Sequence, residues 1–359
     1  MAKQKSSGFV LKDQLFNREK VRYLAELFHS QDACFDVDAF VRAATRPFPS
    51  LELKQRITHL AETLEDYLDP DFRVAAKQVQ SALPPKLNPK LTDDDFGDFI
   101  LAPLGEFVVR NGMDKRHLRL SLQTLKSITQ RFSMEDAIRK FINAYPDETM
   151  STLEKWSTDS NYHVRRLVSE GTRPTLPWSG RLTIDIERPL PLLDQLHADP
   201  TRYVTRSVAN HINDIAKTSP ELVLKHLRRW KKLQKQNEEE LVWLNRHALR
   251  TLIKQGHPQT LKFLGFRANP AITVTDFNLA AVEVRAGEAI HFSFAITANR
   301  DEPLIVDYVI DFVKANGTLA PKVHKLKQLT IAKGETAELK KSHRFHANAT
   351  TYTLYPGMH

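Results

Sequence analysis

The chain has 359 residues, of which 41% are hydrophobic, so it can bury a sizeable core and form two domains without stabilising cross-links. Its single cysteine, Cys34, excludes an internal disulfide and zinc sites built on paired cysteines. The net charge of +9 favours phosphate-bearing partners, and no uncharged apolar run is long enough for a signal peptide or a membrane span, so we expect a basic cytosolic protein.

Helical periodicity dominates the first 269 residues. Apolar side chains recur at helical spacing, as in Leu222, Val223, Leu227 and Trp230. We predict a loose tail from Ala2 to Ser7 and a long connection between helices at residues 84–95. Residues 1–269 hold 42 Lys and Arg against 34 Asp and Glu, so nearly all the positive excess lies in this part.

A repeat becomes visible when segments are compared at an offset of forty residues. DSNYHVRRLV begins at Asp159 and DPTRYVTRSV begins at Asp199, and a basic residue recurs at each equivalent position. These residues are Lys126, Arg166, Arg206 and Arg246. A period of forty residues is typical of HEAT-type helical pairs, which stack into a solenoid. The basic column either binds phosphates or is structural, with each arginine paired to the acid seven residues before it.

Two segments in the middle of the chain carry candidate site residues. In RFSMEDAIRKF, Ser133 is expected to cap a helix that begins near Met134, so Glu135 would be an ordinary acid of the first turn. Arg139 lies one turn after Glu135 and could pair with it. In HVRRLVSEGTRPTLPW, Gly171 is the expected C-cap of a helix.

Glu170 is unusual because a carboxylate at a helix C-terminus faces the negative end of the helix dipole. It is either a salt-bridged structural residue, with Arg166 one turn back, or a functional acid. Trp178 is either the anchor of a connecting loop or an exposed aromatic that contacts a sugar or a base.

Polar residues crowd an otherwise apolar helix in SVANHINDIAK, where Asn210, His211 and Asp214 lie together. His211 and Asp214 could form a catalytic pair or bind a metal ion, although one histidine without a second nearby is weak evidence for a metal site. The sequence contains no Gly-rich phosphate loop, nucleophile elbow or HExxH motif.

The pattern changes to strand-like alternation after Asn269-Pro270, where we place the domain boundary. The segments ITVTDFNLAAVEV, AIHFSFAIT and LIVDYVIDFV are separated by turn signals such as Asn316-Gly317. A sandwich built from them would be expected to continue into another strand after YPGMH. The predicted fold is therefore mainly α, a HEAT-like helical-repeat solenoid over residues 1–269, followed by a small β-sandwich over residues 270–359.

RFSMEDAIRKF, HVRRLVSEGTRPTLPW and SVANHINDIAK, in this order and spacing, resemble the AlkC branch of the AlkC/AlkD superfamily of DNA alkylation repair glycosylases. One subgroup of this branch is similar in carrying an immunoglobulin-like domain after its HEAT-like repeats. The resemblance implies a monofunctional, cofactor-free glycosylase that takes part in base excision repair. It would remove cationic bases such as 3-methyladenine and 3-methylcytosine from double-stranded DNA without flipping them out, as a monomer and with no bound metal.

The resemblance also implies roles for individual residues. The acidic active-site positions fall on Glu135, Glu170 and Asp214, and the aromatic contact falls on Trp178. This assignment suits the chemistry, because carboxylates stabilise the positive charge that develops on the deoxyribose as a cationic base leaves. Beside them we expect DNA contacts from the basic side chains Arg165, Arg166, Arg173 and Arg206, and from His211.

The β domain is nearly neutral but locally basic at residues 321–334. We predict that Lys322, Lys325 and Lys327 contact the DNA backbone, so that this domain closes over the duplex. In the alternative, the domain only covers the apolar end of the last repeat. Two other functions remain open for the whole chain, namely a catalytically silent DNA-binding protein and a HEAT-type scaffold for protein interactions.

Overall fold

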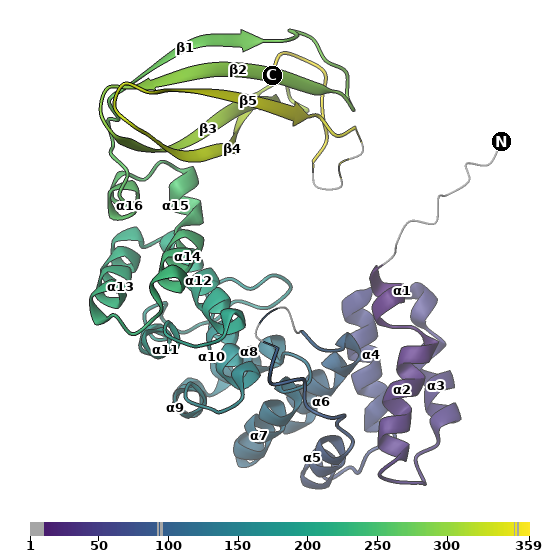
Figure 1. Cartoon of the computed structure of the whole chain (residues 1–359). Coiled ribbons are helices and arrows are strands. Elements are labelled where there is room, and N and C mark those ends of the chain that lie inside the picture. The colour runs from purple at the N-terminus through teal and green to yellow at the C-terminus, as the bar shows by residue number, and fades with distance from the viewer. Residues whose placement is uncertain (1–10, 92, 94–95, 348, 350–351) are drawn as a thin grey trace, which may run out of the picture. The chain divides into compact units, whose positions relative to one another are not determined.

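The computed structural model describes residues 11–91, 93, 96–347, 349 and 352–359, so the predicted tail from Ala2 to Ser7 lies outside the described residues. The chain folds into two compact units, Met1–Leu249 and Arg250–His359. The first unit is helical, and the second contains two short helices followed by strands (Figure 1). The predicted boundary at Asn269-Pro270 lies where helix gives way to strand, whereas the two units divide before these last two helices.

The first unit contains helices that follow one another in chain order (Figure 1). They are α1 (Leu11–Leu15), α2 (Arg18–His29), α3 (Val37–Thr45), α4 (Leu53–Glu65), α5 (Phe72–Ser81), α6 (Ala102–Gly112), α7 (Leu118–Thr129), α8 (Glu135–Ala144), α9 (Pro146–Trp156), α10 (Tyr162–Gly171), α11 (Leu190–Leu196), α12 (Arg202–Ala216), α13 (Pro220–Leu233) and α14 (Glu238–Ala248). The predicted connection at 84–95 lies between α5 and α6, and its residues 92, 94 and 95 are outside the described part.

The forty-residue repeat corresponds to a row of helices. Lys126, Arg166, Arg206 and Arg246 lie on α7, α10, α12 and α14. In this row α7 packs against α10, α10 against α12, and α12 against α14. Asn161 caps α10 and Asn237 caps α14, because each amide oxygen accepts hydrogen bonds from two backbone N–H groups of the first turn. The helical-repeat fold predicted from the sequence is therefore confirmed.

In two repeats the acid at the start does not pair with the arginine seven residues after it, although the structural alternative predicts that pairing. Asp159 instead binds Lys126 at 2.5 Å, and Asp199 binds Arg165 at 2.5 Å. These pairs join neighbouring repeats, because the capped helix start of one repeat lies beside the long basic side chain of the repeat before it. The ion pairs therefore help to fix the stacking of the row.

Gly171 is the last residue of α10 rather than its C-cap, which is Thr172. A Cβ atom at Gly171 would lie 2.5 Å from Ile138 Cγ2 of α8. The glycine is thus required by the close approach of α8 and α10 and not by a left-handed turn. This close packing brings the end of α10, with Glu170, next to the start of α8.

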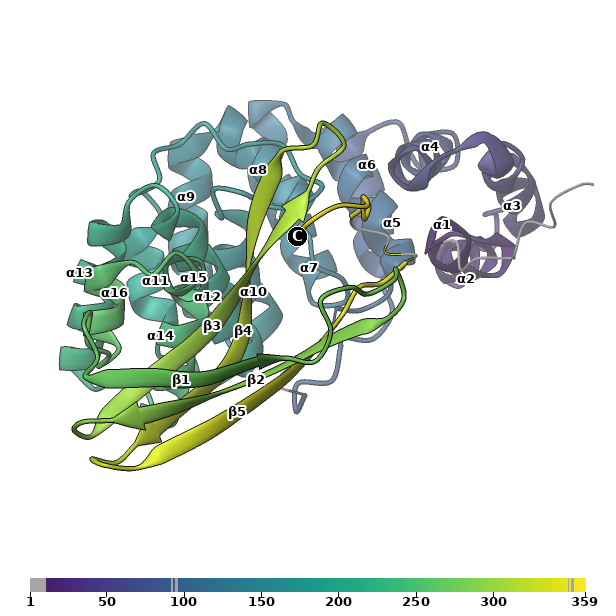
Figure 2. The same ribbon diagram turned by 90° about the horizontal axis from the view of Figure 1, so that it is seen from above.

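The second unit begins with two short helices and continues as two antiparallel sheets (Figure 2). Its elements are α15 (Arg250–Lys254), α16 (Pro258–Phe263), β1 (Ile272–Leu279), β2 (Ala289–Ala298), β3 (Glu302–Val313), β4 (Leu319–Ile331) and β5 (Thr336–Arg344). One sheet has the order β1-β2-β5, and the other pairs β3 with β4. After Arg344 the described residues form no further strand.

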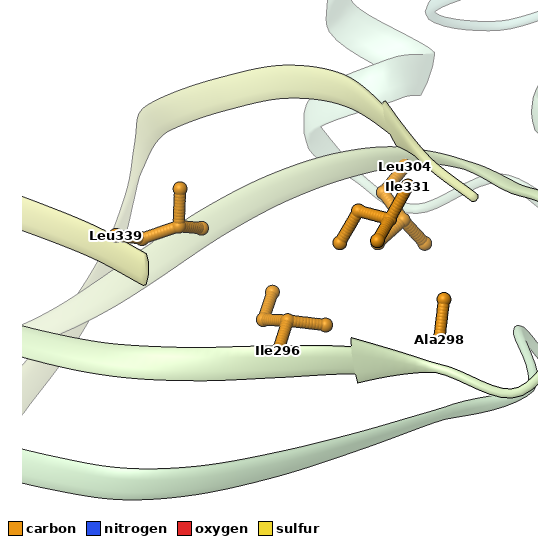
Figure 3. Packing of buried hydrophobic residues seen from close by; sticks show 5 residues of the cluster. All are labelled: Ile296, Ala298, Leu304, Ile331 and Leu339. Atoms are coloured by element: carbon orange, nitrogen blue, oxygen red, sulfur yellow. The ribbon is translucent and has the colours of Figure 1, made fainter. Parts of the chain in front are cut away.

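Alternating side chains of both sheets pack into a common core. Ile296, Ala298 and Leu339 of the three-stranded sheet point toward Leu304 and Ile331 of the two-stranded sheet (Figure 3). This packing of two sheets face to face is the arrangement expected for a small sandwich. The predicted immunoglobulin-like architecture is therefore present as three strands packed on two.

Candidate functional site

Three carboxylates from three helices meet around two arginines in the helical unit. Glu135 is the first residue of α8, Glu170 lies in the last turn of α10, and Asp214 lies in the last turn of α12. Arg166 donates from Nη1 to Glu135 Oε2 at 2.8 Å, and its Nη2 lies 3.7 Å from Glu170 Oε2. Arg173 donates from Nη1 to Glu170 Oε1 at 2.6 Å and from Nε to Asp214 Oδ2 at 2.9 Å. We call these five residues the acid cluster.

Glu170 lies at the centre of the acid cluster and is 4% exposed. Its second oxygen, Oε2, accepts a hydrogen bond of 2.6 Å from the Ser207 hydroxyl. Burial opposes ionisation of this carboxyl, but the guanidiniums of Arg166 and Arg173 outweigh burial and lower its pKa. Glu170 is therefore a buried anion. Both alternatives, a salt-bridged structural residue and a functional acid, require this state.

Glu135 is the most accessible acid of the cluster, with 27% of its side chain exposed against 6% for Glu170 and 3% for Asp214. The helix begins at Glu135 with Met134 at the N-cap position, so Ser133 does not cap it as predicted. The Ser133 hydroxyl donates instead to Glu135 Oε2 at 2.5 Å. Glu135 is thereby fixed in place by Ser133 and Arg166 while one side remains open to solvent.

Opposite charges keep the two arginines protonated. Burial disfavours the Arg166 guanidinium, but Glu135 and Glu170 outweigh burial and raise its pKa. The same balance raises the pKa of Arg173, where the compensating charges are Glu170 and Asp214. Lys217 adds a third cation, 2.9 Å from Asp214 Oδ1. The three acids are thus matched by the two arginines of the cluster and by Lys217 beside it, and these side chains orient one another.

The loop after α10 carries Trp178, whose side chain is 73% exposed. Its backbone has φ 73°, a left-handed conformation that is uncommon for a bulky residue. Lys54 donates to the backbone carbonyl of Trp178, and the Ser179 hydroxyl donates to Asp136 Oδ1 at 2.6 Å. Trp178 is therefore an exposed aromatic on a loop that other elements hold in place, rather than the buried anchor of that loop.

Arg139 was expected to pair with Glu135, but the structure places it elsewhere. It is 2% exposed and donates to backbone carbonyls on both sides of Trp178. The acceptors are Gly171 O at 3.2 Å, Arg173 O at 2.6 Å and Gly180 O at 2.9 Å from Nε and 2.8 Å from Nη2. No sequence pattern predicts this role, because backbone carbonyls are present at every residue.

A pocket of about 450 Å³ is lined by Glu135 of the acid cluster and by Trp178 and its neighbours Pro177 and Ser179. Its apolar wall includes Phe96, Phe99 and Phe132, and its polar rim includes Glu135 and Asp136. Phe96 also lies against Arg166, whose Cζ atom is 5.3 Å from the ring centroid. The exposed carboxylate and the exposed tryptophan therefore border the same space.

Two of the predicted DNA contacts, Arg165 and His211, form bonds within the protein. Arg165 holds Asp199 with Nε and Nη2, at 2.5 and 3.0 Å, and donates to the Asp159 carbonyl at 2.7 Å. His211 is fully buried, and its Nδ1 lies 3.0 Å from the Ser169 carbonyl. Burial lowers the pKa of His211 to about 4, so the ring is neutral near pH 7. Packing between α10 and α12 therefore explains the polar residues that crowd α12.

Comparison with known proteins was made for the whole chain. Residues 14–252 match the family model described as DNA alkylation repair enzyme, and residues 273–359 match the C-terminal Ig-like domain of the uncharacterised protein YhaZ. The chain belongs to the DNA alkylation repair enzyme family. It is 31% identical to the uncharacterized protein YhaZ of Bacillus subtilis (strain 168) over 350 residues, which cover 96% of this chain and 93% of YhaZ.

A solved structure of the same fold is also similar over almost the whole length. It is the Pseudomonas fluorescens alkylpurine DNA glycosylase AlkC bound to DNA containing an abasic site analog. The two chains are 33% identical with a TM-score of 0.86, and the match covers 97% of this chain and 94% of AlkC. The expected AlkC-like fold, with repeats followed by an Ig-like domain, is thus confirmed for this DNA alkylation repair protein.

The remaining predicted DNA contacts of this family member lie outside the acid cluster. Arg206 of α12 forms an ion pair with Asp93, and its Cζ atom lies 5.8 Å from the centroid of the Tyr203 ring. Lys322, Lys325 and Lys327 are exposed on β4, where a register shift lies opposite Val306 and Asp307. These lysines belong to the second unit and stay predicted contacts.

Within residues 11–91, 96–347 and the other described positions, no group of three or more His, Cys, Asp or Glu side chains is arranged to hold a metal ion. No helix in that same part of the chain is long and apolar enough to cross a membrane.

Proposed function

We propose that this chain is a monofunctional DNA glycosylase that hydrolyses the N-glycosidic bond of cationic alkylated bases, with 3-methyladenine and 3-methylcytosine as its substrates. The observation that carries the proposal is the acid cluster beside an exposed tryptophan, in a member of the DNA alkylation repair enzyme family. The AlkC relative is described as an alkylpurine DNA glycosylase and was solved with an abasic site analog, which resembles the product of such a cleavage.

The chemistry of the leaving base decides which protein groups are needed. A base alkylated on a ring nitrogen is already positively charged, so it departs as a neutral molecule without protonation by a general acid. The positive charge moves to the deoxyribose, which becomes oxocarbenium-like in the transition state. Fixed carboxylates stabilise such a charge because they are oriented before the reaction begins.

The three acids differ in what they can contribute. Glu135 retains solvent access and borders the pocket, so it is the carboxylate that a nucleotide meets first. Glu170 and Asp214 are more deeply buried than Glu135 and are both bonded to Arg173. One of the three orients or deprotonates the attacking water, while the others stabilise the sugar cation.

Trp178 and the arginines serve to hold the substrate. The exposed indole offers a π face to the sugar as positive charge develops on it. Arg206, with 26% of its side chain exposed, is the arginine with the most solvent access among the predicted phosphate contacts, whereas Arg166 and Arg173 hold the acids of the cluster in place. Phosphate contacts of this kind position the duplex without reading its sequence. As the resemblance to the AlkC branch implies, the damaged base reacts without being flipped into a pocket, unlike the substrates of most glycosylases.

The direct test is to incubate the protein with methylated double-stranded DNA and identify the released bases by mass spectrometry. Release of 3-methyladenine and 3-methylcytosine, without strand cleavage, is expected for a monofunctional glycosylase. Binding to the duplex with no released base would assign the chain as a silent DNA-binding protein. Failure to bind DNA at all would leave the scaffold interpretation.

A further inference from the structure

The positive excess of the helical part does not reside in the basic residues near the acid cluster. Lys126, Arg165 and Arg206 each have a carboxylate partner, namely Asp159, Asp199 and Asp93. Arg166 and Arg173 are likewise compensated by the three acids of the cluster. Much of the uncompensated charge of the unit therefore lies on other residues.

Helix α13 accounts for much of it. Its sequence, PELVLKHLRRWKKL, holds five Lys and Arg residues against one Glu, and Lys235 lies two residues after the end of the helix. The apolar face of α13 packs inside the unit, because Val223, Leu224, Leu227 and Trp230 are all buried. Burial of that face turns the basic residues outward.

The basic residues of α13 are exposed and mostly uncompensated. Arg229 binds Asp194 at 2.7 Å. The other basic side chains form no ion pair with any residue that the structure describes, and we call them the α13 cationic face: Lys225, Arg228, Lys231, Lys232 and Lys235. Positions 225, 228 and 232 follow helical spacing, so they form one stripe about 10 Å long, and Lys235 lies just beyond the end of the helix.

This face lies on the opposite side of the helical layer from the row that carries the acid cluster. In Figure 1, α9, α11 and α13 form one side of the layer, and α8, α10, α12 and α14 form the other. The outer helix α9 has the reverse character, with the acids Asp147, Glu148 and Glu154 and a single lysine. The cationic face is thus a feature of α13 and not of the whole outer side.

We infer that the α13 cationic face binds the phosphate backbone of a second segment of duplex DNA, outside the acid cluster. Duplex DNA carries one negative charge per roughly 1.7 Å of its axis, so a stripe of uncompensated cations fits it without any pocket or base contact. One protein molecule would then hold one duplex segment at the acid cluster and a second segment at α13. Each contact raises the effective concentration of the other.

An acidic protein surface would be a less suitable occupant. Protein interfaces have an apolar core surrounded by polar groups. Within α13, every residue of which the structure describes, Leu233 is the single exposed large apolar side chain, and it lies at the end of the helix. A face made almost entirely of Lys and Arg instead has the character of a backbone-binding surface, which recognises charge and not sequence.

The test removes the charge without touching the acid cluster. In one variant Lys225, Arg228, Lys232 and Lys235 are replaced by Gln. A matched control replaces four other exposed basic residues, Arg42, Lys77, Arg119 and Lys155, by Gln, so both variants lose the same net charge. Each protein is saturated with a short immobilised duplex that carries an abasic-site analog, and the capture of a second, fluorescent undamaged duplex is measured against salt.

Wild type and control should capture the second duplex, and the α13 variant should lose at least tenfold in affinity for it. Its slope of log K against log salt should fall by roughly 3 to 4, at about 0.9 per neutralised phosphate. Binding of the first duplex should stay within twofold in all three proteins. Equal capture by the α13 variant and the control would overturn the inference.

Two further outcomes would also contradict it. One is that wild type captures no second duplex once the first is saturated. The other is that polyglutamate of matched charge displaces the second duplex completely at equal concentration of charge, which would assign the face to an acidic protein. Because capture is measured with undamaged DNA, the result does not depend on whether the chain excises bases.

Discussion

Arg173 joins Glu170 to Asp214: its Nη1 lies 2.6 Å from one carboxylate and its Nη2 lies 2.8 Å from the other. The two acids come from different helices, and both are almost fully buried. One guanidinium thus compensates two charges that would otherwise repel each other in a low-dielectric environment. Arg173 therefore links α10 to α12 at the acid cluster.

Arg173→Met should destabilise the helical unit by about 3–5 kcal/mol, because it leaves two buried carboxylates without their shared partner. Chemical denaturation followed by far-ultraviolet circular dichroism measures the loss. Arg181→Met is the matched control, since Arg181 is exposed on the same loop. A loss below 1 kcal/mol in Arg173→Met would show that the cluster does not depend on this residue.

Arg139→Lys should loosen the Trp178 loop, because a lysine cannot hold carbonyls of Gly171, Arg173 and Gly180 at once. We expect tryptic cleavage after Arg181 to accelerate several-fold and base excision to slow by roughly 10-fold to 100-fold, since small misplacements of a catalytic element are costly. Lys155→Gln on α9 serves as the control. Unchanged cleavage and unchanged excision together would refute a positioning role for Arg139.

Stability of the helical unit should fall as the pH is lowered from about 6.5 to 4. Burial lowers the pKa of His163 and of His211 to about 4, against an ordinary value of 6.5. Below pH 6.5 the unfolded chain takes up protons that the folded chain does not. The stability that the two neutral histidines contribute is therefore fully present above pH 6.5 and is lost as the pH falls toward 4. Each histidine costs up to about 3 kcal/mol over this range.

Denaturation midpoints at pH 7, 6, 5 and 4.5 measure this pH dependence. His211→Asn should make the dependence shallower, because it removes one of the two titrating groups. A wild-type midpoint that stays constant across the range would contradict the assignment of both rings as buried and neutral.

Replacing Lys322, Lys325 and Lys327 together by Gln should weaken binding to undamaged duplex and reduce the salt slope by up to about 2.7, at roughly 0.9 per phosphate. Electrophoretic or fluorescence titration at several salt concentrations measures both quantities. A control with Lys314, Lys333 and Lys340 replaced by Gln removes equal charge from other exposed positions of the same unit. If the β domain only caps the last repeat, the two triple variants will bind equally well.

Much of the fold was predictable because it depends on periodic patterns. The forty-residue offset identified α7, α10, α12 and α14 as equivalent helices, and the change to alternation after Pro270 identified the strands. Partners distant in sequence were not predictable. Asp159 pairs with Lys126 of the previous repeat because packing of the helices decides which charges meet.

The acid cluster was predicted by resemblance and not by spacing. Glu135, Glu170 and Asp214 lie far apart in sequence, and only the packing of α8, α10 and α12 brings them around Arg166 and Arg173. Burial explains why His211 differs from the prediction that it contacts DNA. His211 has the chemistry of a DNA contact, but its place between two helices removes it from solvent.

The central claim is that the carboxylates of the acid cluster stabilise the positive charge that develops on the sugar. Single-turnover excision of 3-methyladenine from a defined duplex tests it most directly, with wild type compared to Glu135→Gln, Glu170→Gln and Asp214→Asn. We expect Glu170→Gln and Asp214→Asn to be slower by roughly 10²–10³-fold with little change in duplex affinity, and Glu135→Gln also to lose activity. Near-normal rates in both Glu170→Gln and Asp214→Asn would contradict the claim.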